Sequence, residues 1–201
     1  MPKIKLRYFD SPGGRGEDCR LALHIAGVDF HDDRVAFASW RNVKPSTPFG
    51  ALPVLEVEGE GLLSQSNAIL GFIGSRYGLL PQDEFKAAQH RALLNATEEL
   101  RARLNCTMTI KGAEKKKEAR QKLAADYIRP WAKNIEQQIV GPFVAGNDLS
   151  VADLKIYMVL VWFKKGTLDH IPTDFFDGFS KLTSLFEAVT AHPKVVQWYQ
   201  S

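Results

Sequence analysis

The chain opens with a stretch in which apolar and basic residues alternate with a period of two. This alternation is typical of a half-buried β-strand, and it places Tyr8 at the end of the strand. The apolar positions are Ile4, Leu6 and Tyr8, and the basic positions between them are Lys3, Lys5 and Arg7. We therefore expect the fold to begin with a strand that delivers a tyrosine to the edge of a sheet.

A loop, a helix and a second strand are expected next. The loop covers residues 10–16, and the helix covers about 17–26 and stops at Gly27, a residue type that commonly ends helices. Residues 28–35 form a weaker strand, and residues 37–44 form a short irregular segment. A strand, a helix and a parallel strand with short connections are the usual start of an α/β domain.

The most informative stretch covers residues 46–69. Its apolar run at 54–57 is followed by a glycine-containing turn and further apolar residues, which predicts a β-hairpin. A helix starts behind residues 64–66, Ser-Gln-Ser, and the N–H groups and positive dipole end of that start suit an anion. Pro53 opens the first strand of the hairpin, and a cis peptide there would leave the backbone of Leu52 available. Such a place suits a small peptide that carries a carboxylate.

Residues 84–201 show helical periodicity throughout. Residues 156–163 are apolar all round, as in a helix buried in the middle of a bundle. Ser150 precedes that helix and Asp153 follows three residues on, so the pair predicts a capping box. The charge-dense segment 111–122 is interpreted as a solvated loop and helix face. Apolar residues spaced by four predict an apolar stripe on the first long helix: Ala88, Ala92, Ala96, Leu100 and Leu104. Glu98, Arg101 and Arg103 lie off this stripe.

Composition excludes several classes of protein. The 201 residues are 45% hydrophobic and 24% charged, as in an ordinary globular protein of one domain or two small ones. The net charge of +3 is too small to indicate nucleic-acid binding. The start lacks the apolar core of a signal peptide, and no apolar run approaches the length of a membrane span. Two distant cysteines and five unpatterned histidines predict neither a disulfide framework nor a metal site, so a reducing cytosol is the expected setting.

The order Phe-Gly-x-Leu-Pro-Val-Leu-Glu-Val, turn, Leu-x-Gln-Ser-x-Ala-Ile resembles the glutathione-binding half of cytosolic glutathione transferases. With Tyr8, Trp40 and Lys44, the chain is most similar to the sigma class, which includes glutathione-dependent prostaglandin D synthases. The resemblance covers essentially the whole chain. It implies the α/β plus all-α fold of that family: a thioredoxin-like βαβ-ββα domain over residues 1–81, then an all-helical domain over residues 82–201. It also implies a cytoplasmic homodimer without a metal, a nucleic-acid partner or a membrane partner.

The chemistry that the resemblance implies is activation of the thiol of glutathione, its co-substrate. A thiol with a pKa of about 8.5 is mostly protonated at neutral pH, and lowering that pKa by about two units needs about 2.7 kcal/mol. One hydrogen bond to a charged group supplies about 1.5–3 kcal/mol. Tyr8 stands at the family's catalytic tyrosine position, and Arg15 matches an arginine that supports the thiolate. The loop that holds Arg15 is one residue longer than the usual pattern and has one arginine rather than two.

The resemblance assigns further residues to each part of glutathione. The glycyl carboxylate meets Trp40 and Lys44, the cysteinyl unit meets the backbone of Leu52 beside a cis Pro53, and the γ-glutamyl carboxylate meets Gln65 and Ser66. An acidic residue of the partner subunit, Glu98 or Glu99, meets the amino group, and the residues do not choose between the two. The helical domain builds a pocket for a hydrophobic electrophile and part of the dimer interface, with residues 104–108, the loop after the first strand and the Tyr157 region as candidates.

Several alternatives stay open. Each residue of the set also has a plain structural interpretation, such as a tyrosine at a sheet edge, a surface lysine or a helix cap. Isomerisation of a prostaglandin endoperoxide belongs to the same reaction class as conjugation. A non-catalytic assembly module or a carrier of hydrophobic ligands would use the same fold, although an assembly module has no use for a complete site. Cys19 is a poor nucleophile candidate because it lies inside the expected helix without a Cys-x-x-Cys partner, and residues 13–16 lack the spacing of a phosphate loop.

Overall fold

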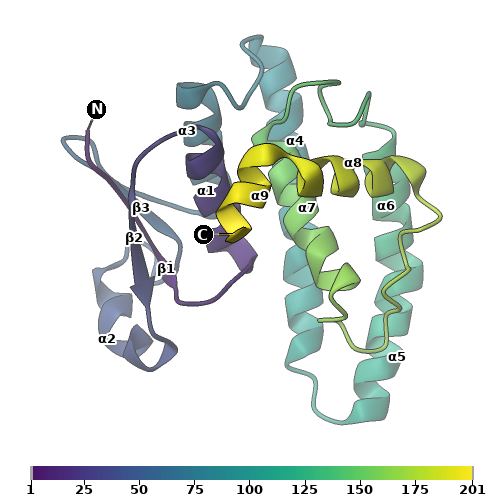
Figure 1. Cartoon of the computed structure of the whole chain (residues 1–201). Helices are drawn as coiled ribbons and strands as arrows, with labels where there is room; N and C mark the ends of the chain where they lie inside the picture. The colour runs from purple at the N-terminus through teal and green to yellow at the C-terminus, as the bar shows by residue number, and fades with distance from the viewer. Residues whose placement is uncertain (1, 201) are drawn as a thin grey trace. The chain divides into compact units, whose positions relative to one another are not determined.

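The computed structural model describes residues 2–200, which pack as two compact units (Figure 1). The first unit runs through Ala87 and takes up the chain again from Pro193, and the second is Ala88–His192. The expected domain boundary at 81/82 falls just before α4 (Glu84–Met108). By its contacts the last helix, α9 (Pro193–Gln200), belongs to the first unit rather than to the helical unit that precedes it in sequence.

The first unit has the expected order of strand, helix, strand, hairpin and helix. Within residues 2–200 its strands form one four-stranded mixed sheet in the order β2-β1-β3-β4, with β1 parallel to β2 and antiparallel to β3. The predicted hairpin is therefore confirmed as β3 and β4. The elements are β1 (Ile4–Phe9), α1 (Gly14–Ile25), β2 (His31–Val35), η1 (Phe37–Ser39), α2 (Trp40–Val43), η2 (Lys44–Ser46), β3 (Val54–Val57), β4 (Gly61–Ser64) and α3 (Ser66–Tyr77).

Two of these elements differ from the expectation. Helix α1 begins at Gly14, three residues before the expected start, because Gly13 and Gly14 adopt φ values of 93° and 72° that turn the chain directly from the loop into the helix. The segment 37–44, expected to be irregular, consists of the short helical turns η1 and α2 and the start of η2. Both differences move residues of the expected site from loops onto helical turns.

The two faces of the sheet are different in character. Leu6 and Leu55 are fully buried on the face that α1 and α3 cover (Figure 1). Lys5 and Arg7 point to the opposite, more open face, because neighbouring residues of a strand alternate between faces. The core of the first unit therefore lies between the sheet and the pair α1 and α3.

Helix α9 is hydrogen-bonded to both ends of α1. Near its start, the Lys194 ammonium donates to the carbonyl of Ile25, 2.5 Å away, at the negative end of the α1 dipole. Near its end, the indole N–H of Trp198 donates to Oε1 of Glu17 in the first turn of α1, at 2.7 Å. Val195 between them is buried. These contacts explain why the C-terminal helix groups with the first unit.

The second unit is all-helical, as expected. Its central helix α7 has every residue from Val151 to Leu160 buried. No helix in residues 2–200 combines the length and the apolar character needed to cross a membrane. After α4, the elements of the unit are α5 (Ala113–Leu123), the π-helical turn η3 (Ala124–Ile128), α6 (Arg129–Glu136), α7 (Val151–Lys164) and α8 (Ser180–Ala191).

The expected apolar stripe on α4 is wrong in its first half. Ala88 and Ala92 are exposed. An α-helix has 3.6 residues per turn, so positions spaced by four drift around the axis, whereas alternating steps of three and four stay on one face. The residues that are actually buried follow those alternating steps and include polar and charged ones: His90, Leu94, Thr97, Arg101 and Leu104.

Charged side chains are buried where the pattern of the sequence places them in solvent. Arg101 and Lys155 are both fully buried, and both approach Oε2 of Glu98, at 3.8 Å and 2.5 Å. Arg120 lies in the segment interpreted as solvated, yet its guanidinium donates to Thr107 Oγ1 at 3.1 Å and to the carbonyl of Asp169 at 2.7 Å. Such ion pairs form only when tertiary packing brings the helices together.

The predicted capping box at the start of α7 is confirmed, and it is connected to α4. The backbone N–H of Ser150 donates to Asp153 Oδ2 at 2.8 Å, and the Ala152 N–H donates to Ser150 Oγ at 3.3 Å. The Ser150 hydroxyl donates to Asp153 Oδ2 at 2.7 Å. It therefore accepts from His90, whose Nδ1 lies 3.1 Å away. This assigns the neutral, Nδ1-protonated tautomer to a buried histidine.

The buried histidine predicts a dependence of stability on pH. Burial lowers the pKa of His90 in the folded state, so its contribution is fully present above the unfolded pKa of about 6.5 and is lost as the pH falls from there towards the folded pKa. We expect the free energy of unfolding in urea to fall from about pH 7.5 to about pH 5.5 more steeply in the wild type than in His90→Asn, whose amide donates at any pH. Asp153 is present in both proteins, so the difference between the two slopes reports the titration of His90. Equal slopes would contradict the assignment.

Candidate functional site

Tyr8 lies at the end of β1, and its ring packs directly on the start of α1. A Cβ atom on Gly16 would lie 2.1 Å from Cγ and Cδ1 of the ring, and one on Gly14 would lie 2.9 Å from the Tyr8 hydroxyl. Only glycine fits at Gly16, and the φ of +72° at Gly14 also favours glycine. The hydroxyl of Tyr8 is therefore held beside the first residue of α1, at the positive end of the helix dipole.

Arg15 follows Gly14 directly, as the second residue of α1, and is partly exposed. The sequence suggested that it belongs to a loop, but the early start of the helix places it in the same turn as the Tyr8 hydroxyl. The Tyr8 hydroxyl and the N-terminus of α1 thus lie together, with an arginine in the same helical turn. A hydroxyl and a helix N-terminus both favour a negative charge placed there.

Arg20, which the sequence did not single out, lies beneath this turn. Its side chain is fully buried, and its Cζ atom lies 5.6 Å from the centre of the Tyr8 ring, over the ring face. Its guanidinium donates to the carbonyls of Phe9 and Ser11, both at 3.2 Å. It also pairs with Asp32 on β2, where Nε lies 2.9 Å from Oδ1. A charged residue in a helix is usually interpreted as exposed, so only packing reveals its role.

Trp40 and Lys44 each begin a short helical turn. The Trp40 ring meets the ring of Phe9 edge to face, with centroids 5.3 Å apart and planes at 72°. The Phe9 ring is also stacked on Phe37, at 4.7 Å and 11°. The stem of Lys44 passes over Gly50, where an added Cβ would lie 3.2 Å from Lys44 Cε, and the lysine is exposed. Aromatic packing therefore orders α2, and it leaves the lysine charge open to a ligand.

The peptide bond between Leu52 and Pro53 is cis, as predicted. Pro53 is buried, and β3 begins directly after it at Val54. No hydrogen bond between residues of the described chain uses the backbone N–H or C=O of Leu52. The segment that leads into β3 therefore offers one donor and one acceptor of the main chain at this position.

Gln65 and Ser66 form the start of α3. Gln65 has a φ of 75° and a ψ of 115°, a conformation that L residues rarely adopt and that costs about 1–3 kcal/mol. Ser66 is the first residue of the helix and is buried, whereas Gln65 is exposed. Ser64 before them is buried, and its hydroxyl has no hydrogen-bond partner among residues 2–200. A strained residue at an exposed helix start indicates a binding site.

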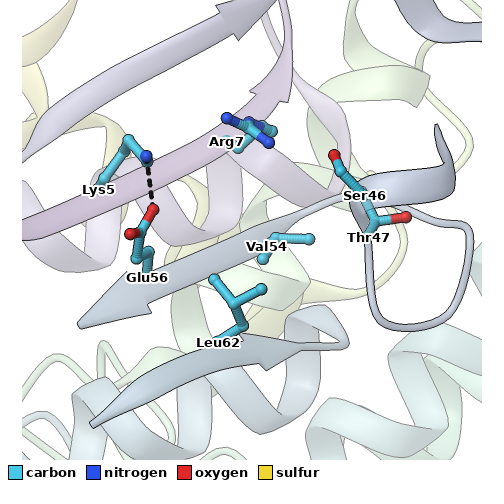
Figure 2. A pocket seen from close by; sticks show the side chains of 7 residues that line it. All are labelled: Lys5, Arg7, Ser46, Thr47, Val54, Glu56 and Leu62. Atoms are coloured by element: carbon cyan, nitrogen blue, oxygen red, sulfur yellow. Dashed lines mark ion pairs between the residues drawn. The ribbon is translucent and has the colours of Figure 1, made fainter. Parts of the chain in front are cut away.

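The residues predicted to activate or bind glutathione within one subunit all belong to the first unit: Tyr8, Arg15, Trp40, Lys44, Leu52, Pro53, Gln65 and Ser66. A separate shallow pocket lies on the open face of its sheet, away from the face of Leu6 and Tyr8 (Figure 2). Its two cations are already neutralised, because Lys5 pairs with Glu56 at 2.5 Å and Arg7 pairs with Asp33 at 2.6 Å. The pocket is lined by Lys5, Arg7, Ser46, Thr47, Val54, Glu56 and Leu62.

Glu98 and Glu99, the acidic candidates of the second unit, form ion pairs with basic residues of the same unit. Glu98 pairs with Lys155, as described above, and Glu99 pairs with Arg103 at 2.7 Å. Hydrogen bonds from Arg103 and Tyr127 lower the pKa of Glu99. No cluster of three or more His, Cys, Asp or Glu side chains within residues 2–200 is arranged to hold a metal ion.

Two residues of the segments expected to contribute to an apolar pocket are buried in the second unit. Leu104 is fully buried, and Tyr157 is buried against Phe186, with ring centroids 5.2 Å apart. Burial also raises the pKa of the Tyr157 hydroxyl. The exposed residues of the candidate segment 104–108 are Cys106 and Met108. A ligand that contacts this segment therefore meets these two side chains.

Comparisons with known proteins agree on one family. The family model for the glutathione S-transferase N-terminal domain matches residues 4–75, and that for the C-terminal domain matches residues 99–201. Glutathione S-transferase 1 of Ascaris suum is 32% identical over 204 residues, which is 98% of this chain and 96% of that protein.

Solved structures show the same fold. A prostaglandin synthase D of Nilaparvata lugens has a TM-score of 0.87 and 25% identity, covering all of this chain and 98% of its own. A monomeric glutathione S-transferase of the hookworm Necator americanus has a TM-score of 0.82 and 25% identity, covering 98% of this chain and 96% of its own.

The contact between Tyr8 and Gly16 predicts an unusual effect of a small substitution. Alanine normally stabilises a helix by about 0.5–1 kcal/mol relative to glycine. At Gly16 the added methyl group would collide with the tyrosine ring, so we expect Gly16→Ala to lower the free energy of unfolding by about 1–3 kcal/mol. Gly178→Ala is the control, because no atom lies within 4 Å of the Cβ it would add. Equal stabilities of the two variants in urea would show that the ring is not held there.

Proposed function

The chain belongs to the glutathione S-transferase family and is a glutathione transferase, and we propose that it activates the thiol of glutathione through Tyr8 and joins the sulfur to hydrophobic electrophiles. The observation that carries this proposal is the position of the Tyr8 hydroxyl at the start of α1, next to Gly14 and in the same turn as Arg15. A thiolate beside that hydroxyl would meet a hydrogen-bond donor, a helix dipole and a cation.

The energies are sufficient for this chemistry. Making the thiolate dominant at neutral pH needs about 2.7 kcal/mol, and a hydrogen bond from the Tyr8 hydroxyl to a charged sulfur supplies about 1.5–3 kcal/mol. The α1 dipole adds about 0.3–1 kcal/mol, and Arg15 adds to it. The thiol proton leaves to solvent. The sulfur lone pair then forms the C–S bond, and the leaving group departs with the electron pair of the bond that breaks.

The remaining residues of the site fit the three parts of glutathione. Lys44 is an exposed point charge suited to the glycyl carboxylate, with Trp40 beside it. The free N–H and C=O of Leu52 suit the backbone of the cysteinyl unit. The α3 N-terminus, with Gln65 and Ser66, suits the γ-glutamyl carboxylate. This set supports a small peptide with a carboxylate at each end.

We assign the protein to the sigma type and expect a cytoplasmic homodimer that detoxifies electrophiles. Large apolar side chains of the first unit are exposed, with Phe49 at 69%, Phe85 at 75% and Leu62 at 54%, and a partner subunit would cover such surface. Cys106 is a free, exposed thiol, which suits a reducing compartment. Light scattering decides the assembly, and a monomer at micromolar concentration would contradict this assignment.

A second function of the same site is isomerisation of a prostaglandin endoperoxide. The likeness to the prostaglandin synthase D structure favours it. The thiolate would attack one peroxide oxygen, and the O–O bond would break so that the other oxygen leaves as an alkoxide and takes a proton. Loss of the proton from the carbon that bears the sulfur-bound oxygen would then form the carbonyl, break the S–O bond and release the thiolate. An endoperoxide substrate, assayed beside the electrophile, distinguishes this function from general conjugation.

Replacing Tyr8 by phenylalanine removes only the hydroxyl. We expect Tyr8→Phe to lower kcat/KM for conjugation of glutathione to chlorodinitrobenzene by about tenfold to a hundredfold, because about 1.4–2.7 kcal/mol of thiolate stabilisation is lost. The affinity for glutathione should stay within about twofold, since the contacts to the two carboxylates remain. The measurements are turnover and calorimetric binding.

The pattern of results discriminates between functions. Binding of glutathione without turnover by the wild type would favour the isomerase or a ligand carrier. If the wild type neither binds glutathione nor turns over substrate, an assembly module becomes the better interpretation. Full activity in Tyr8→Phe would remove the tyrosine from the mechanism.

The strained backbone of Gln65 predicts opposite effects on stability and binding. Gln65→Gly removes about 1–3 kcal/mol of backbone strain. Glycine loses about 0.5–1 kcal/mol more conformational entropy on folding, so we expect a net stabilisation of about 1 kcal/mol. Affinity for glutathione should fall about tenfold, because one hydrogen-bonding side chain is lost. Gln137→Gly is the control: Gln137 is exposed with a φ of −66°, so it should only lose stability. Loss of stability in both variants would contradict the strain.

A further inference from the structure

We propose that the C-terminal helix α9 sets the position of Tyr8 through a buried chain of contacts, from Trp198 to Glu17 to Arg20. These three are positioning residues, because none of them belongs to the set that meets glutathione. The inference rests on the proposed function, since it concerns the efficiency with which the same tyrosine stabilises a thiolate.

The last link of the chain is the contact of Arg20 with the tyrosine and its loop. The guanidinium lies over the Tyr8 ring and donates to the carbonyls on either side of Asp10, those of Phe9 and Ser11. It therefore fixes both the ring face and the backbone that leads away from it. A displacement of this group would move the hydroxyl relative to the first turn of α1.

The middle link is Glu17, which is itself buried. One carboxylate oxygen, Oε2, accepts from Nη1 of Arg20 at 3.2 Å, and the same nitrogen donates to the Ser11 carbonyl. The other oxygen, Oε1, accepts from the indole N–H of Trp198 at 2.7 Å. The two oxygens of one carboxylate thus connect the loop after β1 to the C-terminal helix. A buried carboxylate needs both of these donors, because unpaired oxygens are costly away from water.

The first link is Trp198, and packing fixes its indole. The ring lies 5.2 Å from the ring of His24 and 6.4 Å from that of Phe30, measured between centroids. Its N–H is therefore directed at Glu17 by a rigid aromatic contact rather than by a flexible side chain. The carboxylate of Glu17 is held in one orientation as a result.

Helix α9 has a second anchor that does not lead to the site. Lys194 donates to the carbonyl of Ile25 at the far end of α1. Removing either hydrogen bond weakens the attachment of α9, but of these two only the bond from Trp198 is made to Glu17, which pairs with Arg20. A variant of Lys194 is therefore the matched control for a variant of Trp198.

The test compares Trp198→Phe, which keeps an aromatic ring but lacks the N–H, with Lys194→Met, which keeps a long apolar stem. The readout is the pKa of the thiol of bound glutathione, from the thiolate absorbance as a function of pH. We expect Trp198→Phe to raise that pKa by about 0.3–1, which is a two- to tenfold loss of thiolate below it. Turnover should fall by the same factor at low pH and approach the wild type at high pH. The dissociation constant for glutathione should change by less than about twofold.

A double-mutant cycle identifies the path. Glu17→Gln retains an oxygen for the indole and removes the charge that faces Arg20. We expect it to raise the thiol pKa as well, and we expect Trp198→Phe to add little in the Glu17→Gln background, because the two act through one link. Fully additive shifts would overturn the path through Glu17, even if both variants are less active. Should Trp198→Phe fold poorly, Glu17→Gln against the Lys194→Met control carries the same test.

The remaining outcomes are decisive too. An unchanged thiol pKa in Trp198→Phe, in a protein that binds glutathione and turns over substrate, overturns the inference and leaves the proposed function standing. Equal shifts in Trp198→Phe and Lys194→Met overturn it as well, because they would show a general effect of loosening α9. A wild type that does not bind glutathione overturns the proposed function itself, and with it the premise of this inference.

Discussion

The first unit depends on the burial of the Arg20 guanidinium. Arg20 has no exposed surface, so its guanidinium must find partners for its N–H groups inside the protein. It finds them on Asp32 of β2, on Glu17 of α1, and on the carbonyls of Phe9 at the end of β1 and Ser11 in the loop that follows. A charge that is satisfied in this way imposes one relative position on the strands, the helix and the loop, because any other position leaves buried donors unpaired.

The position of Tyr8 on the first turn of α1 follows from that constraint. With the loop and α1 held, the Tyr8 ring has one place to lie, and glycine at positions 14 and 16 makes the room for it. The hydroxyl then lies beside the start of α1, in the same turn as Arg15. Close packing of an aromatic ring on glycine is a rigid way to position a donor, since neither side has conformational freedom.

The helical unit uses the same principle with different groups. His90 on α4 connects to the capping box of α7, Lys155 on α7 connects to Glu98 on α4, and Arg120 connects α5 to the end of α4. Apolar packing alone tolerates small slips between helices, whereas buried polar pairs do not. These contacts specify the register of the helices, and they also make the stability of the unit sensitive to pH.

The sequence by itself determined the order of the elements and most of the site. The alternation at the first strand, the turn chemistry of the hairpin, the cis proline and the capping box are local signals, since neighbours along the chain set backbone conformation. The tertiary structure decided which charges are buried, and the sequence misplaced Arg101 and Arg120 for that reason. The contact of Trp198 with Glu17, and through Glu17 with Arg20, exists only through packing, because Glu17 and Trp198 are 181 positions apart in the sequence. A pattern along the chain reports the period of each element, whereas the partners of a buried charge depend on how distant elements meet.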